Sequence, residues 1–203
     1  MKLRKIVSLP LGLLLVLVSV FVFAQQKKAA PPPMDEKAAM EMMQKLATPG
    51  EAHKKLDALV GDWVAKNTIW MDPSKPPEVT EGTSVHRWVL GQRFVGQHYD
   101  GKLFGQPFSG MGFTGYDNYR KKYVSIWMDT STTTIMNMTG SFDAAGKVLT
   151  TTGEMDDFTT GKAVTLRETT TIVNKDEILF EMFAPGPAGK EYKMMEIRYT
   201  RKK

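Results

Sequence analysis

The sequence predicts a mainly β protein, an antiparallel up-and-down β-barrel of about ten strands preceded by two short helices. After residue 62, short runs of Val, Ile, Thr, Tyr, Phe and Trp alternate with Gly, Pro, Asn and Asp clusters about every 8 to 14 residues. No segment in this region is long enough for a crossover helix, which argues against parallel βαβ units. Closing the strands into a barrel hides their edges. A two-sheet sandwich is the alternative architecture.

The first 24 residues have the three parts of a secretory signal peptide. Lys2, Arg4 and Lys5 precede an apolar run over residues 6–23, and small residues stand at the −3 and −1 positions of a cleavage site after Ala24. We therefore expect export to the periplasm or the extracellular space, with cleavage after Ala24. An uncleaved membrane anchor is the alternative, because the run is long enough to span a bilayer. Interruptions at Pro10 and Gly12 argue against it.

Composition excludes several classes of function. The 203 residues contain no cysteine, which excludes disulfide scaffolds, thiolate metal sites and a cysteine nucleophile. The three leader cations account for three of the five net positive charges, so the mature chain carries only +2. So small a net charge gives no indication of the basic surface that binds nucleic acid. We expect no membrane association of the mature form, and nothing in the sequence indicates an oligomeric state.

Two segments precede the strands. Residues 25–34 contain three consecutive prolines and are predicted to be a solvated linker. Residues 35–60 are predicted to be helical. A first helix over 35–47 is rich in strong helix formers, with apolar residues at three- and four-residue spacing. A second helix is expected to start with Thr48 as its cap and Pro49 in its first turn.

Residues 61–203 are predicted to form the β-barrel domain. Its ten expected strands are Trp63–Met71, Glu78–Leu90, Arg93–Phe104, Phe108–Tyr116, Lys122–Asp129, Thr134–Phe142, Lys147–Met155, Lys162–Val173, Ile178–Phe183 and Glu191–Tyr199. A barrel of this size can enclose a small ligand.

Several short motifs carry a resemblance to a known family. They include Pro49-Gly50-Glu51, Gly61-Asp62-Trp63, Trp70-Met71-Asp72-Pro73, Arg87-Trp88, Gly115-Tyr116-Asp117-Asn118, Lys122-Tyr123-Val124-Ser125 and Met195-Glu196-Ile197. Together they resemble a bacterial family described only as domain of unknown function 1579, over residues 49–201. The resemblance implies a calycin-like or lipocalin-like barrel, in which the Trp of a Gly-x-Trp motif plugs the closed end. It implies no reaction. Haem-binding barrels of the nitrobindin type share this entry pattern, but none of the histidines here is matched to their haem ligand.

Two histidines are the candidates for a metal or haem site. If the hairpin at Gly91 is tight, positions 86 and 96 face each other, so that His86 and His98 are diagonal neighbours on one face. Such neighbours could share a metal or a haem edge, although a third ligand is not evident nearby. Ordinary strand histidines, hydrogen-bonded to the wall, are the favoured interpretation, and we expect no cofactor.

Charged residues interrupt otherwise apolar strand faces. Glu168 alternates with Leu166 and Thr170, Glu181 with Leu179 and Phe183, and Arg87 with Val85 and Val89. Either these faces point outward, or Arg87, Arg167, Glu168 and Glu181 include members of an internal polar cluster. An internal cluster would bind the polar end of a ligand held by apolar walls.

Aromatic and methionine side chains are frequent in the expected strands. Aromatics at strand spacing usually fill a core, but a Trp- and Met-lined interior also suits an irregular apolar guest. The candidate ligand-binding residues are Trp70, His86, Trp88, His98, Tyr99, Trp127, Arg167 and Glu181. No catalytic or metal-binding residue is assigned.

The sequence favours binding over catalysis. Ser109 lacks the strand-to-helix elbow and the preceding glycine of a nucleophile motif. The first hypothesis is an exported, non-enzymatic barrel that binds a small apolar molecule. The second is a haem- or metal-dependent enzyme that uses His86 and His98. The third is an envelope protein whose barrel is filled by its own side chains and which acts through surface contacts.

Overall fold

The computed structural model describes residues 35–158, 160–186 and 189–203. The predicted signal peptide and the proline-rich linker lie outside this part of the chain. Residues Glu36–Lys203 form one compact unit. None of the helices among the described residues is long and apolar enough to cross a lipid bilayer.

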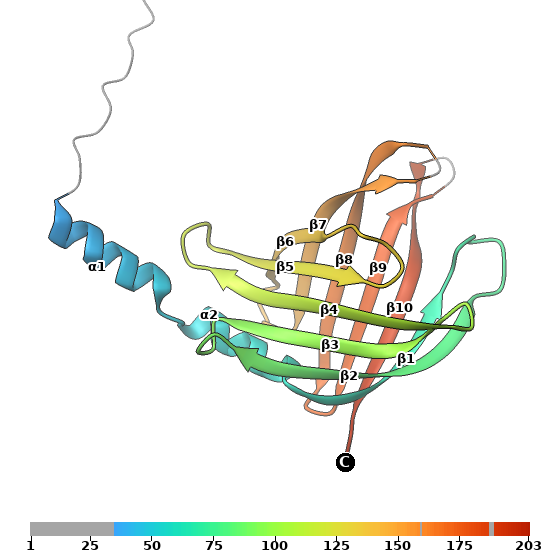
Figure 1. The fold of residues 1–203 in the computed structure, drawn as a ribbon, viewed down its shortest axis with the longest axis horizontal. Helices are drawn as coiled ribbons and strands as arrows, with labels where there is room; N and C mark the ends of the chain where they lie inside the picture. The colour runs from blue at the N-terminus through green and yellow to red at the C-terminus, as the bar shows by residue number, and fades with distance from the viewer. Residues whose placement is uncertain (1–34, 159, 187–188) are drawn as a thin grey trace, which may run out of the picture. The chain divides into compact units, whose positions relative to one another are not determined.

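The described residues form a closed antiparallel β-barrel, as the sequence predicts (Figure 1). Each strand pairs with its neighbours in the sequence, and the first strand closes the barrel against the last. The strands are β1 (Gly61–Ile69), β2 (Glu78–Val89), β3 (Phe94–Leu103), β4 (Gln106–Asp117), β5 (Lys122–Asp129), β6 (Met136–Phe142), β7 (Val148–Asp157), β8 (Lys162–Asn174), β9 (Glu177–Pro185) and β10 (Glu191–Arg201).

The pairing of β1 with β10 decides between a barrel and a sandwich. It runs from Trp63 opposite Arg201 to Ile69 opposite Met195, without a break in register. Neither terminal strand is therefore left as an unpaired edge, and the sandwich alternative is wrong. Closure also removes the exposed edge groups on which other chains could add strands.

Three helical segments precede the barrel: α1 (Glu36–Ala47), α2 (Glu51–Lys54) and a 3₁₀ helix, η1 (Lys55–Leu59). The expected cap at Thr48 is wrong. Its hydroxyl donates instead to the Gln44 carbonyl at 2.7 Å, and α2 begins after Gly50. The Gly50 N–H donates to Nδ1 of His53 at 3.1 Å, so a histidine ring satisfies one backbone donor at this helix start.

Since consecutive strands run in opposite directions, the barrel has two distinct ends. We call the end where β1 begins and β10 finishes the helix end, because η1 leads directly into β1 there. The turns after β2, β4, β6 and β8 lie at the same end. The loops after β1, β3, β5, β7 and β9 lie at the opposite end, which we call the far end.

Alternation along each strand separates the inward and outward faces. On β1, Trp63, Ala65 and Asn67 are buried, whereas Val64 between them is 40% exposed. The same period of two recurs on the other strands. A residue two positions before or after an inward-facing residue on the same strand therefore also faces inward.

Two inward glycines of β4 make room for a large aromatic side chain. A Cβ atom on Gly110 would lie 2.2 Å from Cζ2 of Trp127, and one on Gly112 would lie 2.9 Å from its Cε3. The indole of Trp127 therefore packs directly on the bare backbone of the neighbouring strand. Close packing against Trp127 is what requires glycine at these two positions.

Candidate functional site

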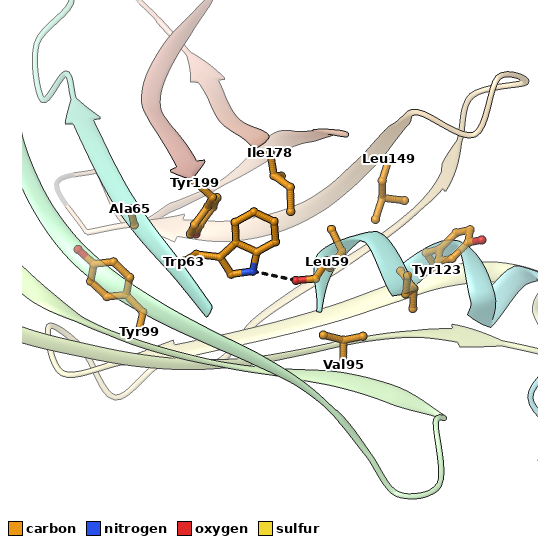
Figure 2. Close-up of a cluster of buried hydrophobic side chains, with 10 residues drawn as sticks. Leu59, Trp63, Ala65, Val95, Tyr99, Tyr123, Leu149, Ile178 and Tyr199 are labelled. Atoms are coloured by element: carbon orange, nitrogen blue, oxygen red, sulfur yellow. Dashed lines mark hydrogen bonds between the residues drawn. The ribbon is translucent and has the colours of Figure 1, made fainter. Parts of the chain in front are cut away.

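The helix end of the barrel is filled by Trp63 and the residues around it. Trp63 is fully buried, and its indole N–H donates to the Leu59 carbonyl at 3.0 Å (Figure 2). The guanidinium of Arg201 lies 4.2 Å from the centre of the indole ring and donates to the Val60 carbonyl at 2.9 Å. One side chain thus joins the last strand, the first strand and the end of η1.

The segment α2–η1 lies across this end of the barrel and is attached to its wall. The hydroxyl of Tyr123 on β5 donates to the Ala52 carbonyl at 2.8 Å. The indole N–H of Trp88 on β2 donates to the carboxylate of Asp57, also at 2.8 Å. Leu56 is fully buried among the aromatic side chains of the core. Figure 2 shows Tyr123 and Leu149 close to this helical segment, while Tyr199 and Ile178 approach Trp63.

Buried polar side chains form a connected group next to Trp63. Oγ of Ser84 lies 2.9 Å from Nε2 of His86, and Nε2 of Gln97 donates both to Ser84 and to the Tyr199 hydroxyl, each at 3.2 Å. Burial lowers the pKa of His86 to about 4, partly offset by a hydrogen bond to the Leu59 backbone. His86 is therefore neutral at physiological pH.

A second polar pair lies farther along β1. Nδ2 of Asn67 donates to the Tyr99 hydroxyl at 2.7 Å and to the Thr80 hydroxyl at 3.3 Å. Burial raises the pKa of Tyr99, so its hydroxyl keeps its proton. That proton remains available for donation to a further acceptor.

Glu168 is an acidic side chain inside the barrel. It lies in the middle of β8 and is only 7% exposed. Its Oε2 accepts a hydrogen bond from Thr151 at 3.0 Å, and Thr151 is its one hydrogen-bond partner among the described residues. Burial raises the pKa of Glu168 to about 7, while the Thr151 hydroxyl opposes this rise. The carboxyl group is therefore poised to gain or lose a proton near neutral pH.

Beside Glu168 the interior is rich in methionine. Leu166 follows the same face of β8, and Met182 is directly opposite Glu168 on β9. We call the apolar group around them the methionine cluster; it consists of Met138, Leu166 and Met182 with Met136, Met155, Val164, Phe180, Ala184, Met194 and Met195. Unbranched thioether side chains adapt to guests of irregular shape.

Exposed apolar side chains mark the far end. Four of the loops there each carry one: Met71 is 70% exposed, Phe104 55%, Ile135 53% and Phe158 69%. Side chains of this kind on successive loops around a barrel mouth are typical of a surface that meets an apolar partner or guest.

The candidate residues from the sequence fall into two sets. His86, Trp88, Tyr99 and Trp127 point inward: His86 and Tyr99 are buried, and Trp88 and Trp127 pack against the main core. The other four, Trp70, His98, Arg167 and Glu181, do not line the interior.

These four residues lie on the outer surface, where neighbouring side chains satisfy most of them. Arg167 stacks on the Phe183 ring at 3.9 Å and pairs with Glu191 at 2.6 Å. Glu181 pairs with Lys193 at 3.0 Å, and the same ammonium lies 5.5 Å from the centre of the Trp70 ring.

The sequence left open whether the charged strand residues Arg87, Arg167, Glu168 and Glu181 face outward or form an internal cluster. Of these four, only Glu168 faces the interior. Arg87 pairs with Asp62 on the outer surface, and Arg167 and Glu181 have the outer partners described above. An internal polar anchor near Arg167 and Glu181 is therefore wrong. The internal carboxyl group belongs to Glu168, the residue next to Arg167, on the opposite face of β8.

The expected pairing of His86 with His98 is also wrong. The turn Leu90–Arg93 has positive φ at Leu90, Gly91 and Gln92, and it places His86 opposite Gln97 rather than opposite Gly96. A shift of one residue reverses the face of every side chain. His98 therefore points outward, where its Nε2 lies 2.9 Å from Asp100.

Histidine, aspartate and glutamate do not form a metal-binding group in the described part of the chain: no three of these side chains come together there. The nearest neighbours of His86 are instead Ser84, Trp63 and Tyr199. This geometry assigns His86 to the packing and hydrogen bonding of the helix end.

Replacement of the two histidines should separate their roles. We expect His86→Ala to lower the free energy of unfolding by about 2–3 kcal/mol, because it opens a cavity and leaves buried polar partners unsatisfied. His98→Ala should change it by less than about 0.5 kcal/mol, as is usual for surface positions. Urea unfolding monitored by tryptophan fluorescence measures both. Equal losses in the two variants would contradict the assigned faces.

Sequence reasoning missed Arg201, Ser84, Gln97 and Asn67. A signal was present for Asn67 and Ser84, since each is two residues from a neighbour on the inward face, Ala65 or His86. Gln97 and Arg201 carry the same signal, since they lie two residues from Tyr99 and Tyr199, but their roles depend on partners far away in the sequence.

Comparison with known proteins identifies a family and a fold. The family described as "Protein of unknown function (DUF1579)" matches residues 48–201. The crystal structure of Rv2717c from M. tuberculosis is similar to this chain with a TM-score of 0.57 and 15% sequence identity, over 77% of this chain and 100% of that one. At this identity the likeness shows the fold alone. No curated protein matches the sequence.

Proposed function

Because this chain belongs to the DUF1579 family, whose function is unknown, we propose a function from the barrel itself: it is an exported protein that binds a small, largely apolar molecule. The proposed site is the inside of the barrel between the methionine cluster and the buried carboxyl group of Glu168. The single observation that carries the proposal is this buried acid, which has one hydrogen-bond partner in the described part of the chain and apolar neighbours.

A carboxyl group in such a place has a cost in stability. Burying an ionised carboxylate with incomplete pairing is unfavourable, and an apolar residue would fill the position without that cost. Ligand pockets typically have extensive apolar walls and only a few polar groups. The exposed apolar side chains at the far end support entry of an apolar molecule from that side. Export is supported by the charged and apolar pattern of residues 1–24.

Purification from the native host tests both parts of the proposal. We expect native mass spectrometry to show the polypeptide without residues 1–24 and with an additional bound mass that dissociates on collisional activation. A mass equal to that of the bare polypeptide in every preparation would contradict ligand binding. Retention of the leader would contradict cleavage.

A fluorescent probe tests the location of binding. N-phenyl-1-naphthylamine is neutral and apolar, and its emission rises when it leaves water. We expect it to bind to the purified barrel, and the interior double substitution Met155→Gln with Met195→Gln to weaken binding at least about fivefold through the loss of apolar contact. The control is Val79→Gln with Val85→Gln, at exposed positions, which should leave the affinity unchanged. Equal losses in both variants would place the probe on the surface and contradict the proposal.

A further inference from the structure

The charges inside the barrel are distributed very unevenly. Among the described strand residues, alternation places two cations on the inward face, and neither lies near the middle of the barrel. Arg201 is at the helix end against Trp63, and Lys162 is the exposed first residue of β8 at the far end. The other strand cations alternate onto the outward face, where Arg87, Arg167 and Lys193 pair with acidic side chains. Within the part of the chain that the structure describes, Glu168 therefore has no cation beside it.

The residues that face Glu168 are neutral. Thr151 on β7 and Met182 on β9 are its cross-strand neighbours, and Leu166 and Thr170 flank it on β8. The pKa of Tyr199 on β10 is raised, chiefly by burial and in small part by the negative charge of Glu168. His86 on β2 is neutral and engaged with Ser84. None of these described groups carries a positive charge that could balance an ionised Glu168.

This arrangement has a direct consequence for the polar end of a guest. A carboxylate headgroup would meet a second acid with no cation to bind it, so a fatty acid is disfavoured. A protonated amine would supply the absent partner, and charge-assisted hydrogen bonds of this kind are about twice as strong as neutral ones. These charge-assisted hydrogen bonds are stronger still in a protein interior, away from bulk water.

Resting on the proposed function, we propose that the molecule bound by this barrel is a cationic amphiphile, with an amine that pairs with Glu168 and an apolar body held by the methionine cluster. The ligand class follows from three features together: the position of Glu168 at the middle of an inward face, Thr151 as its one hydrogen-bond partner among the described residues, and the lack of nearby cations on the described strands.

The test compares three probes that differ only in their headgroup. Decylamine, decan-1-ol and decanoate, each below its micelle concentration, compete with N-phenyl-1-naphthylamine for the purified protein at about pH 8. We expect decylamine to bind about tenfold more tightly than decan-1-ol, and decanoate to bind more weakly than the alcohol. At about pH 5.5, where Glu168 is protonated, the advantage of the amine should shrink.

Matched variants assign the preference to one side chain. Glu168→Gln should remove the advantage of decylamine while changing the affinity for decan-1-ol by less than about twofold. Glu181→Gln makes the same change on the outer surface and should retain the preference. Decanoate binding as tightly as decylamine, or a preference that persists in Glu168→Gln, would overturn the headgroup proposal and leave the proposed function standing. Failure of all the probes, the naphthylamine included, would overturn both. The wild-type comparison remains decisive if Glu168→Gln does not fold.

Discussion

Trp63→Ala should lower the free energy of unfolding by about 3–5 kcal/mol, the range found when a large buried aromatic side chain is truncated. Trp63 is fully buried, and it also provides the donor for Leu59 and the surface on which Arg201 stacks. The substitution thus weakens the attachment of η1 and the closure of β1 on β10 together. Equilibrium unfolding in urea, followed by circular dichroism, measures the loss.

The control for this prediction is Trp70→Ala. Trp70 follows β1 directly but lies on the outer surface, in partial contact with solvent. We expect its truncation to cost about 1 kcal/mol or less. A similar loss in both variants would show that the helix end does not depend on Trp63 in the way described.

Glu168→Gln should change how stability depends on pH. In the folded chain the pKa of Glu168 is about 7, against an ordinary value of 4.5. Between these two values the folded state holds a proton that the unfolded state has released. The contribution of Glu168 to stability is therefore fully present below about pH 4.5 and is lost as the pH rises through about 7. A pKa difference of this size corresponds to about 3 kcal/mol.

The difference between Glu168→Gln and the wild type isolates this effect. Burial of His86 acts in the opposite direction, because its lowered pKa makes stability fall as the pH drops from 6.5 towards about 4. Both proteins share that contribution, so it cancels. We expect the variant to gain about 3 kcal/mol relative to wild type between about pH 4 and about pH 8. A constant difference across this range would contradict a buried, raised Glu168.

The same buried acid connects stability with binding. An ionised Glu168 without a cationic partner destabilises the folded barrel at neutral pH, and a bound amine removes that cost. A ligand that binds only the folded state adds its own stabilisation. Thermal unfolding of the wild type should therefore respond to decylamine more strongly at about pH 8 than at about pH 5.5.

Most strand positions could be predicted from local sequence. Lys122–Asp129 is found with the same bounds, and the other expected strands differ from the observed ones by about two residues or fewer at each end. The reason is that β-branched and aromatic runs end at turn residues, and both signals lie within a few residues of each other. The pairing of β1 with β10 was predicted from the need to hide strand edges and not from any local motif.

The candidate site could be predicted only in part, because alternation relates residues within a strand without saying which face is inside. Glu168 and Glu181 both have apolar neighbours two residues away, yet the first is buried and the second pairs with Lys193 outside. Closure of the barrel decides between them, since it determines which face of each strand meets the opposite wall.

The sequence by itself determined the class of fold, the order of its elements and the kinds of side chain available to an interior. The tertiary structure alone decided which of those side chains meet. One residue of register in the turn Leu90–Arg93 moves His98 away from His86, and the wrapping of ten strands leaves Glu168 inside with no cation beside it on the described strands. Such outcomes depend on pairings between residues far apart in the chain, and the energies that select them are summed over the whole barrel rather than carried by any short segment.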